Sequence, residues 1–431
     1  MTTVLAPELV LDADGPRRGL AVTVDPATGL ITDVGTATEG ALALPGRVLM
    51  PGVANVHSHA FQRDLRGVVE RAAPEGRDDF WTWRTAMYDL AGRLDPDGIE
   101  DVARRAYREM RSAGFTSVGE FHYVHHRPDG TPYDDPNELA MRVIAAAEAE
   151  GMRIVLLLVA YARAGAGRPA EPGQRRFCDP DVATYLARLD DLRRRTVDRT
   201  LVRVGAAPHS VRAVPADWLE AIAAHCAAHG LPLHIHACEQ RREIEECLAE
   251  HGVRPVELLR RTGALGPRTV IVHGTHADAH EMDLLARAGA TVCACPATEA
   301  DLGDGYVPAE ELHRRGVPMA VGTDANGRID PFAELRELEL IARRTAERRN
   351  VLVAPGEEGP TPGLLRSAWR HGPAALGLPE GRIAPGAPAD LIAVDLTHDR
   401  IAGVADEHLA AAIVFTGGPE LVRETWIGGR A

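Results

Sequence analysis

The sequence contains no lysine, so all 48 residues counted as lysine or arginine are arginine. This absence excludes a Schiff-base lysine, the lysine of a phosphate-binding loop, and a metal pair bridged by a carbamylated lysine. The remaining chemistry must therefore come from other side chains. We infer no function from the high arginine content itself.

Cysteines, basic charge and long apolar runs are also scarce. Six cysteines without a CxxC pair do not make a disulfide framework. Acidic residues outnumber basic ones, and the net charge of −14 argues against nucleic-acid and anionic-membrane partners. No apolar run approaches the ~20 residues of a membrane span. The first residues lack a basic start followed by an apolar core, so we expect no signal peptide and a cytoplasmic enzyme.

Short, almost wholly apolar runs alternate with segments of helical period in the middle of the 431-residue chain. Eight such runs are candidate strands: 53–57, 115–120, 153–161, 201–207, 231–236, 269–273, 290–295 and 317–322. Segments such as 137–150 and 332–349 lie between them and favour helices. The alternation predicts an α/β fold, a (β/α)₈ TIM barrel, with a doubly wound open sheet as the alternative.

The two ends of the chain have a different pattern. Residues 1–50 and 380–431 alternate short apolar runs with Gly, Asp and Pro turns, which is typical of short antiparallel strands. We therefore predict one small β-sandwich-like domain built from 1–50 and 376–431. The catalytic barrel would then occupy 51–375.

The strongest local motif is His57-Ser58-His59, at the end of the first predicted barrel strand. Residues i and i+2 of a strand point to the same face, so the two imidazoles converge. Imidazole is the commonest side-chain ligand for zinc, and barrel enzymes place their chemistry at this end of the strands. The structural alternative is a pair of polar loop histidines.

Other ionisable side chains follow four more predicted strands. They are His209 and Arg212 after the fourth, His236 and Glu239 after the fifth, His273 after the sixth, and Asp324 after the eighth. A single histidine at a strand end is more often a satisfied core residue. The joint placement of these groups at one barrel mouth predicts a metal-centred site.

The ligand types restrict the metal. Three neutral nitrogens and one carboxylate suit Zn²⁺, or Fe²⁺, better than Mg²⁺ or Ca²⁺. Since no lysine can bridge two ions, we predict one divalent metal per chain. It would lower the pKa of a bound water from ~15.7 towards ~7. Glu239 and His273 could then move protons.

At this point the chain resembles the amidohydrolase superfamily, in its mononuclear aminohydrolase branch, over nearly its whole length. The resemblance rests on PGVANVHSH (51–59), HIHACE (234–239), VHG (272–274), TDA (323–325) and GRIAPGAPADLIAVD (381–395). It implies that His57, His59, His236 and Asp324 bind the metal, and that Glu239, His273 and Asp324 are catalytic. Spacing alone would let His273 be a ligand.

A narrower resemblance is to the formimidoylglutamate deiminases of histidine degradation. It rests on HSHAFQRDLRG (57–67), FWTWRTAMY (80–88), GEFHYVHH (119–126), APHSVRAV (207–214) and CPATEADLGDG (295–305). It implies hydrolysis of N-formimino-L-glutamate to N-formyl-L-glutamate and ammonia, and a homodimer. Asp301 departs from the pattern, because asparagine is expected there.

A small acidic amidine of this kind carries two carboxylates, which call for forked guanidinium donors. Arg84 and Arg212 lie in the matching motifs, and we predict that they bind the substrate. Gln62, Tyr123 and His209 could add hydrogen bonds. Outside this motif, Arg84 would be interpreted as a surface arginine.

Other functions share the predicted metal residues. One is deamination of a purine, pyrimidine or S-adenosylhomocysteine-like ring by another mononuclear amidohydrolase, and another is hydrolysis of imidazolonepropionate. A third, from a different class, is a catalytically inactive barrel that only binds a ligand. The residues that line the pocket distinguish ring deamination from hydrolysis of an acidic substrate. Ring deaminases need amide and aromatic contacts there, whereas an acidic substrate needs arginines.

Overall fold

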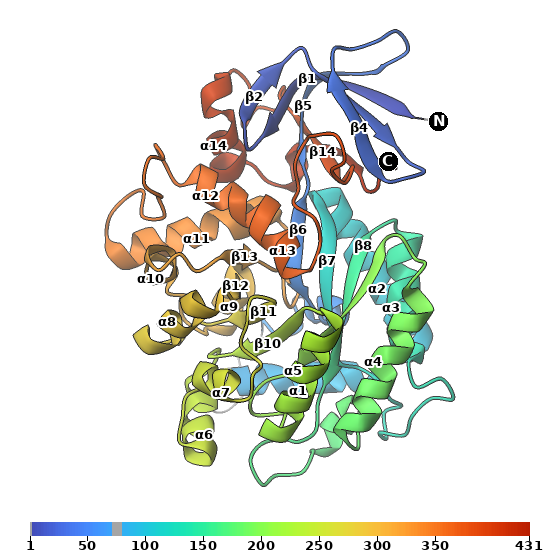
Figure 1. Cartoon of the computed structure of the whole chain (residues 1–431), viewed down its shortest axis with the longest axis vertical. Helices are drawn as coiled ribbons and strands as arrows, with labels where there is room; N and C mark the ends of the chain where they lie inside the picture. Colours follow the sequence, from blue (N-terminus) through green and yellow to red (C-terminus); the bar gives the residue numbers. More distant parts are fainter. Residues whose placement is uncertain (1, 71–79) are drawn as a thin grey trace.

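Eight parallel strands form a barrel, and each predicted strand segment overlaps one of them. The computed structural model describes residues 2–70 and 80–431. The strands follow chain order around the barrel: β6 (Val53–Ser58), β7 (Phe115–His122), β8 (Arg153–Ala160), β9 (Val202–Pro208), β10 (Leu233–Ala237), β11 (Thr269–His273), β12 (Thr291–Ala294) and β13 (Met319–Val321). The predicted (β/α)₈ barrel is confirmed (Figure 1).

The barrel closes between its first and last strands. Ser58 and Asp324 form a parallel bridge just beyond the paired strands. The backbone N–H of Asp324 donates to the carbonyl oxygen of His57 at 3.0 Å, and the N–H of His59 donates to the carbonyl of Asp324 at 2.9 Å. The closure therefore lies at the residues that the sequence assigns to the metal.

Helices cover the outside of the barrel, so its strands are buried on both faces. They are α2 (Pro96–Ala113), α3 (Glu138–Ala149), α4 (Val182–Thr196), α5 (Ala216–His229), α6 (Arg241–His251), α7 (Pro255–Arg261), α8 (Ala279–Ala288), α9 (Pro296–Leu302), α10 (Ala309–Arg314), α11 (Pro331–Ala346), α12 (Thr361–Arg366) and α13 (Gly372–Ala375). Helix α11 begins as its sequence predicts: the Asp330 carboxylate accepts two backbone N–H groups, and Pro331 takes the first turn.

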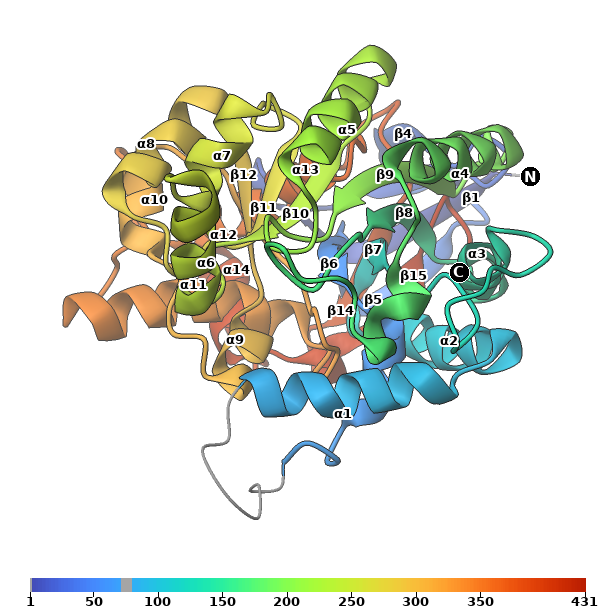
Figure 2. The same cartoon turned by 90° about the horizontal axis from the view of Figure 1, so that it is seen from below.

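Helix α1 (Phe80–Arg93) precedes these helices in the chain and lies beside the barrel in Figure 2. Five of its side chains, at positions 80, 83, 84, 87 and 88, reach the same pocket as the strand-end residues. Among the described residues, no helix combines the length and apolar character needed to span a bilayer.

The two ends of the chain meet in one seven-stranded sheet at the top of Figure 1. It contains β1 (Thr3–Asp12), β2 (Gly15–Arg18), β3 (Ala21–Asp25), β4 (Leu30–Gly35), β5 (Leu42–Pro51), β14 (Leu391–Asp395) and β15 (Val422–Trp426), with α14 (Asp406–Thr416) between the last two strands in the chain. Its other pairs are antiparallel as predicted, but β1 and β5 are parallel. The reason is that residues 36–41 cross over to β1 instead of folding β5 back onto β4.

An ion pair joins the barrel to the C-terminal segment. Arg153, at the start of β8, donates from Nε and Nη2 to both carboxylate oxygens of Asp390, at 2.7 and 2.9 Å. The side chains are only 14% and 15% exposed, and Asp390 also accepts the backbone N–H of Gly428 at 2.7 Å. One carboxylate therefore holds both the barrel and the turn after β15.

We predict that Arg153→Met lowers the free energy of unfolding by roughly 2–3 kcal/mol, because it leaves the half-buried Asp390 carboxylate without its cation. Urea unfolding followed by circular dichroism measures this change. Arg260→Met is the control, since Arg260 forms an exposed pair with Glu257 and its loss should leave the midpoint unchanged. Equal midpoints for the two variants would contradict the prediction.

Candidate functional site

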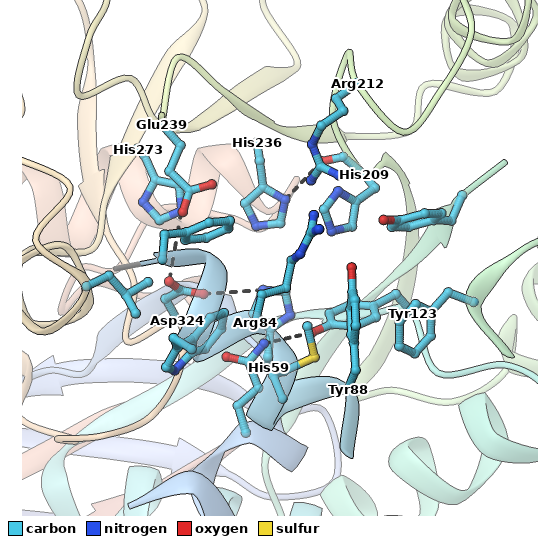
Figure 3. Close-up of a pocket in the computed structure, with 17 residues that line it drawn as sticks. His59, Arg84, Tyr88, Tyr123, His209, Arg212, His236, Glu239, His273 and Asp324 are labelled. Atoms are coloured by element: carbon cyan, nitrogen blue, oxygen red, sulfur yellow. Dashed lines mark hydrogen bonds and ion pairs between the residues drawn. The ribbon is translucent and has the colours of Figure 1, made fainter. Parts of the chain in front are cut away.

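The four predicted metal ligands converge at the barrel mouth. His59, His236 and Asp324 are labelled in Figure 3. Nε2 of His57 lies 3.2 Å from Nε2 of His59, 3.2 Å from Nε2 of His236 and 3.2 Å from Oδ1 of Asp324. Nε2 of His59 lies 3.3 Å from the same carboxylate oxygen. All four residues are buried, and one donor atom from each lies within 4.8 Å of the others.

Backbone carbonyls set the orientation of two of these imidazoles. Nδ1 of His59 donates to the carbonyl oxygen of Phe121, and Nδ1 of His236 donates to that of His209, both at 2.9 Å. Because a carbonyl oxygen only accepts, each Nδ1 carries the proton and each Nε2 keeps its lone pair. The two lone pairs therefore point into the cluster.

Burial keeps the cluster histidines neutral. It lowers the pKa of His57 to about 3, and it also lowers the pKa values of His59 and His236. Burial alone would raise the pKa of Asp324, but His57, His59 and His273 together outweigh burial and lower that pKa below its ordinary value. The Nε2 lone pairs of His59 and His236 and the ionised carboxylate of Asp324 repel one another unless a cation lies between them. This donor set fits one divalent transition-metal ion.

Three residues near the cluster adopt left-handed backbone conformations that are costly for residues other than glycine. They are Cys238 at φ 57°, His273 at φ 71° and Asp324 at φ 46°, at or just beyond the ends of β10, β11 and β13. Each such conformation costs about 1–3 kcal/mol and persists where the surroundings impose it. Here it turns the chain sharply where each barrel strand ends.

His273 and Glu239 lie beside the cluster. Nε2 of His273 is 3.8 Å from Oε1 of Glu239 and 3.9 Å from Oδ2 of Asp324, while its Nδ1 is 3.3 Å from Oε1 of Glu299. Burial lowers the pKa of His273, but Glu239 and the other carboxylates outweigh it and hold that pKa well above its ordinary value. Burial raises the pKa of Glu239. The two groups lie close enough for a proton to pass between them through a bound water or substrate.

The predicted substrate residues line one pocket with the predicted metal and catalytic residues (Figure 3). Its lining includes Gln62, Arg84, Tyr123, His209 and Arg212 together with His59, His236, Glu239, His273 and Asp324. His57 lies beneath the pocket, where it is fully buried. Asp301 does not line this pocket, and its carboxylate pairs with Arg328 at 3.1 Å.

The side chains of Arg84 and Arg212 both line the pocket. Within residues 2–70 and 80–431, no carboxylate forms an ion pair with either guanidinium. The guanidinium of Arg84 lies over the ring of Trp81 at 4.5 Å and over that of Tyr88 at 5.4 Å. Arg212 also donates to the carbonyl oxygen of Ala164 at 3.4 Å, which leaves its charge unneutralised. Two guanidinium groups without a carboxylate partner make a site for an anionic group.

Gln62 offers the pocket a different group. Its Nε2 donates to the hydroxyl of Tyr123 at 2.7 Å, whose own hydrogen goes to Sδ of Met87 at 3.3 Å. Its Oε1 is buried and has no hydrogen-bond partner in the described structure. A ligand N–H group would satisfy that oxygen.

Sequence reasoning missed several pocket residues, namely Met87, Tyr88, Tyr161, Phe177 and Leu302. Tyr161 is the last residue of the predicted strand 153–161. A polar side chain at a strand end is the feature that identified His273, and the same feature could have identified Tyr161. Tyr88 lies in the 80–88 motif. Phe177 follows a loop with neither a strand end nor a periodic pattern, so no local signal marks it.

Comparisons with known proteins agree with this geometry. A sequence-family model described as the amidohydrolase family matches residues 48–431. A formimidoylglutamate deiminase from Pseudomonas aeruginosa is 41% identical over 394 residues, which cover 91% of this chain and 86% of that protein.

Two solved structures share the fold. A crystal structure of an amidohydrolase from Brucella melitensis has a TM-score of 0.92 and 36% identity, and the match covers 99% of this chain and 94% of the other. A crystal structure of an adenosine deaminase from Xanthomonas campestris with bound zinc has a TM-score of 0.82 and 25% identity, with 99% and 92% covered.

We predict that the chain purifies with one divalent ion, and that chelation lowers its unfolding temperature. An ion that binds only the folded state stabilises it, by about 2.7 kcal/mol when its concentration is 100 times Kd. His59→Ala should remove both the ion and the effect of the chelator. Elemental analysis and thermal unfolding measure these changes.

His280→Ala is the matched control, because it removes an imidazole that is 65% exposed on α8. This variant should keep one ion per chain. A His59→Ala protein that also keeps one ion per chain would exclude His59 as a ligand.

Proposed function

This chain belongs to the amidohydrolase family, and from that premise we propose that it hydrolyses N-formimino-L-glutamate to N-formyl-L-glutamate and ammonia. One observation carries the proposal: a single pocket contains a metal-type cluster, two proton-transfer groups and two arginines without carboxylate partners. The similarity to the Pseudomonas aeruginosa deiminase supports the same reaction. The coarser activity, hydrolysis of a C–N bond that is not a peptide bond, follows from the family.

The pocket can hold a diacid with an amidine head in one orientation. Arg84 and Arg212 would bind the carboxylates as forked donors. Gln62 would accept an N–H of the formimino group with its unpartnered Oε1, and Tyr123 and His209 would line the path between the two ends. This orientation places the formimino carbon beside the histidine cluster.

His57, His59, His236 and Asp324 would hold one divalent metal, with Zn²⁺ favoured over Fe²⁺. When bound, the metal lowers the pKa of a water molecule so that it ionises near neutral pH. The zinc in the Xanthomonas campestris relative supports the choice of ion.

The reaction adds water across the formimino carbon and expels its terminal nitrogen. Oδ2 of Asp324 and Nε2 of His273 lie 3.9 Å apart, and would hold the proton that the attacking water loses. Glu239, which lies beside His273, would deliver a proton to the terminal nitrogen. The tetrahedral carbon then bears OH and NH₂ groups. The hydroxyl would return a proton to Glu239, and the NH₂ group would receive the proton held between Asp324 and His273. The C–N bond then breaks, the C–O bond becomes the formyl carbonyl, and ammonia leaves.

The pathway and the assembly belong to the same proposal. Histidine degradation and a homodimer are implied by the narrower resemblance, and a cytoplasmic location by composition. All three stay predictions.

We expect Glu239→Gln to lower kcat by about 10²–10⁴-fold, because the amide cannot carry the proton to the leaving nitrogen. Metal content should remain at one ion per chain, since Glu239 is not among the four clustered ligands. Release of ammonia and elemental analysis measure the two properties. Glu245→Gln, on the exposed face of α6, is the control and should keep its activity. Near-normal turnover by Glu239→Gln would refute its role.

Substrate choice tests the proposed reaction directly. We expect ammonia release from N-formimino-L-glutamate to be far more efficient than release from adenosine. Loss of imidazolonepropionate, followed by absorbance, should be negligible. Arg84→Met and Arg212→Met should each raise KM by roughly 10- to 100-fold, as expected when a hydrogen bond to a charged group is lost. More efficient turnover of adenosine or imidazolonepropionate would show that N-formimino-L-glutamate is not the substrate.

A further inference from the structure

Two tyrosine hydroxyls in the pocket share one amide donor. Nε2 of Gln174 donates to the hydroxyl oxygen of Tyr88 at 3.0 Å and to that of Tyr161 at 2.8 Å. Gln174 is fully buried in the 3₁₀ helix η2 (Pro172–Phe177). Tyr88 comes from α1, and Tyr161 directly follows β8. One side chain thus joins three segments beside the pocket.

The amide of Gln174 can point only one way. Its Oε1 accepts the backbone N–H of Glu171 at 2.9 Å, which turns the NH₂ group towards the tyrosines. An NH₂ group donates and does not accept, so both phenol oxygens must act as acceptors. Each hydroxyl hydrogen therefore has to find an acceptor elsewhere.

The surroundings of these hydroxyls consist mainly of donors. Arg84 and Arg212 line the same pocket as Tyr88 and Tyr161, and the guanidinium of Arg212 also hydrogen-bonds to Tyr161. Within the described part of the chain, neither hydroxyl donates a hydrogen bond. In Figure 3 the hydroxyl of Tyr88 points towards the space where Arg84 and His209 also lie.

Packing holds both rings in place. The ring centroid of Phe177, at the end of η2, lies 5.7 Å from that of Tyr88 and 5.9 Å from that of Tyr161. Arg176 anchors the same turn, because its buried guanidinium donates to the backbone carbonyls of Leu94 and His126. The donors are therefore arranged before any ligand binds.

We propose that Tyr88 and Tyr161 donate their hydroxyl hydrogens to a substrate carboxylate that Arg84 and Arg212 bind, and that Gln174 is the positioning residue that orients both hydroxyls. The inference rests on the proposed function in requiring a substrate with a carboxylate. It adds the two tyrosine hydroxyls, which are neutral donors, to the two arginine cations. It also adds Gln174, which orients both hydroxyls. A neutral analogue would leave four donors unpaired, so the subsite selects for an anion.

Steady-state kinetics with N-formimino-L-glutamate test the subsite. Tyr88→Phe and Tyr161→Phe should each raise KM roughly tenfold, while kcat stays within about threefold, because only a hydrogen bond to bound carboxylate is lost. Gln174→Met should also raise KM. In the Tyr88→Phe, Tyr161→Phe background, Gln174→Met should add less than about twofold, since it acts through the two hydroxyls.

Tyr185→Phe is the matched control. Tyr185 is a fully buried tyrosine whose hydroxyl donates to the carbonyl oxygen of Leu158 at 2.9 Å, and it does not line the pocket. Its loss should affect thermal stability but leave KM unchanged. A similar rise of KM in Tyr185→Phe would show a general structural effect and overturn the inference.

Binding of glutarate, a five-carbon dicarboxylate, separates this inference from the proposed reaction. Titration calorimetry should show wild-type binding and a Kd raised roughly tenfold by Tyr161→Phe. If N-formimino-L-glutamate is not hydrolysed but this difference in Kd is found, the subsite stands and the reaction fails. If turnover occurs but the variants keep wild-type KM and Kd, or glutarate does not bind, the subsite is refuted and the reaction stands.

Discussion

The close approach of three imidazole Nε2 atoms and one carboxylate is the interaction on which this structure depends. Nε2 of His57 has three such neighbours at 3.2 Å, and the Nε2 atoms of His59 and His236 carry no proton. Such an arrangement is repulsive by itself, so the fold must impose it. The barrel does so at its closure, because the backbone of Asp324 bonds to the strand that carries His57 and His59. The backbone hydrogen bonds that close the barrel therefore also bring the side chains of the cluster together.

Buried polar groups strengthen that closure. The Glu120 carboxylate accepts the hydroxyl of Ser58 at 2.9 Å and the backbone N–H of Ala60 at 2.8 Å, and so holds the turn on both sides of His59. Asn326 donates to the backbone carbonyls of His59 and Asp324 at 3.0 and 3.1 Å. Binding of a cation would then repay the cost of gathering like groups in one place. Opposite the cluster, arginine and tyrosine donors form a second centre suited to an anion.

Much of this arrangement could be predicted from local sequence. Apolar runs identify parallel strands, and the carboxyl ends of such strands meet at one mouth, so His236, His273 and Asp324 could be grouped without coordinates. Gln174 could not, because a buried amide inside a short 3₁₀ turn leaves no periodic trace. The parallel pairing of β1 with β5 was also beyond reach, since it depends on which edge of β1 is free and not on alternation within either strand. Tyr161 lies between these cases, because it is a polar ring at the end of an otherwise apolar run.

Anomalous diffraction at the zinc absorption edge, from crystals of the zinc-loaded protein, tests the central claim most directly. The account predicts one strong peak bound by Nε2 of His57, His59 and His236 and by a carboxylate oxygen of Asp324, at about 2.0–2.2 Å from each. A different group of potential ligands, Asp190, His225 and His229, lies on α4 and α5 outside the barrel. A strong peak at that group, with none at the barrel mouth, would contradict the account.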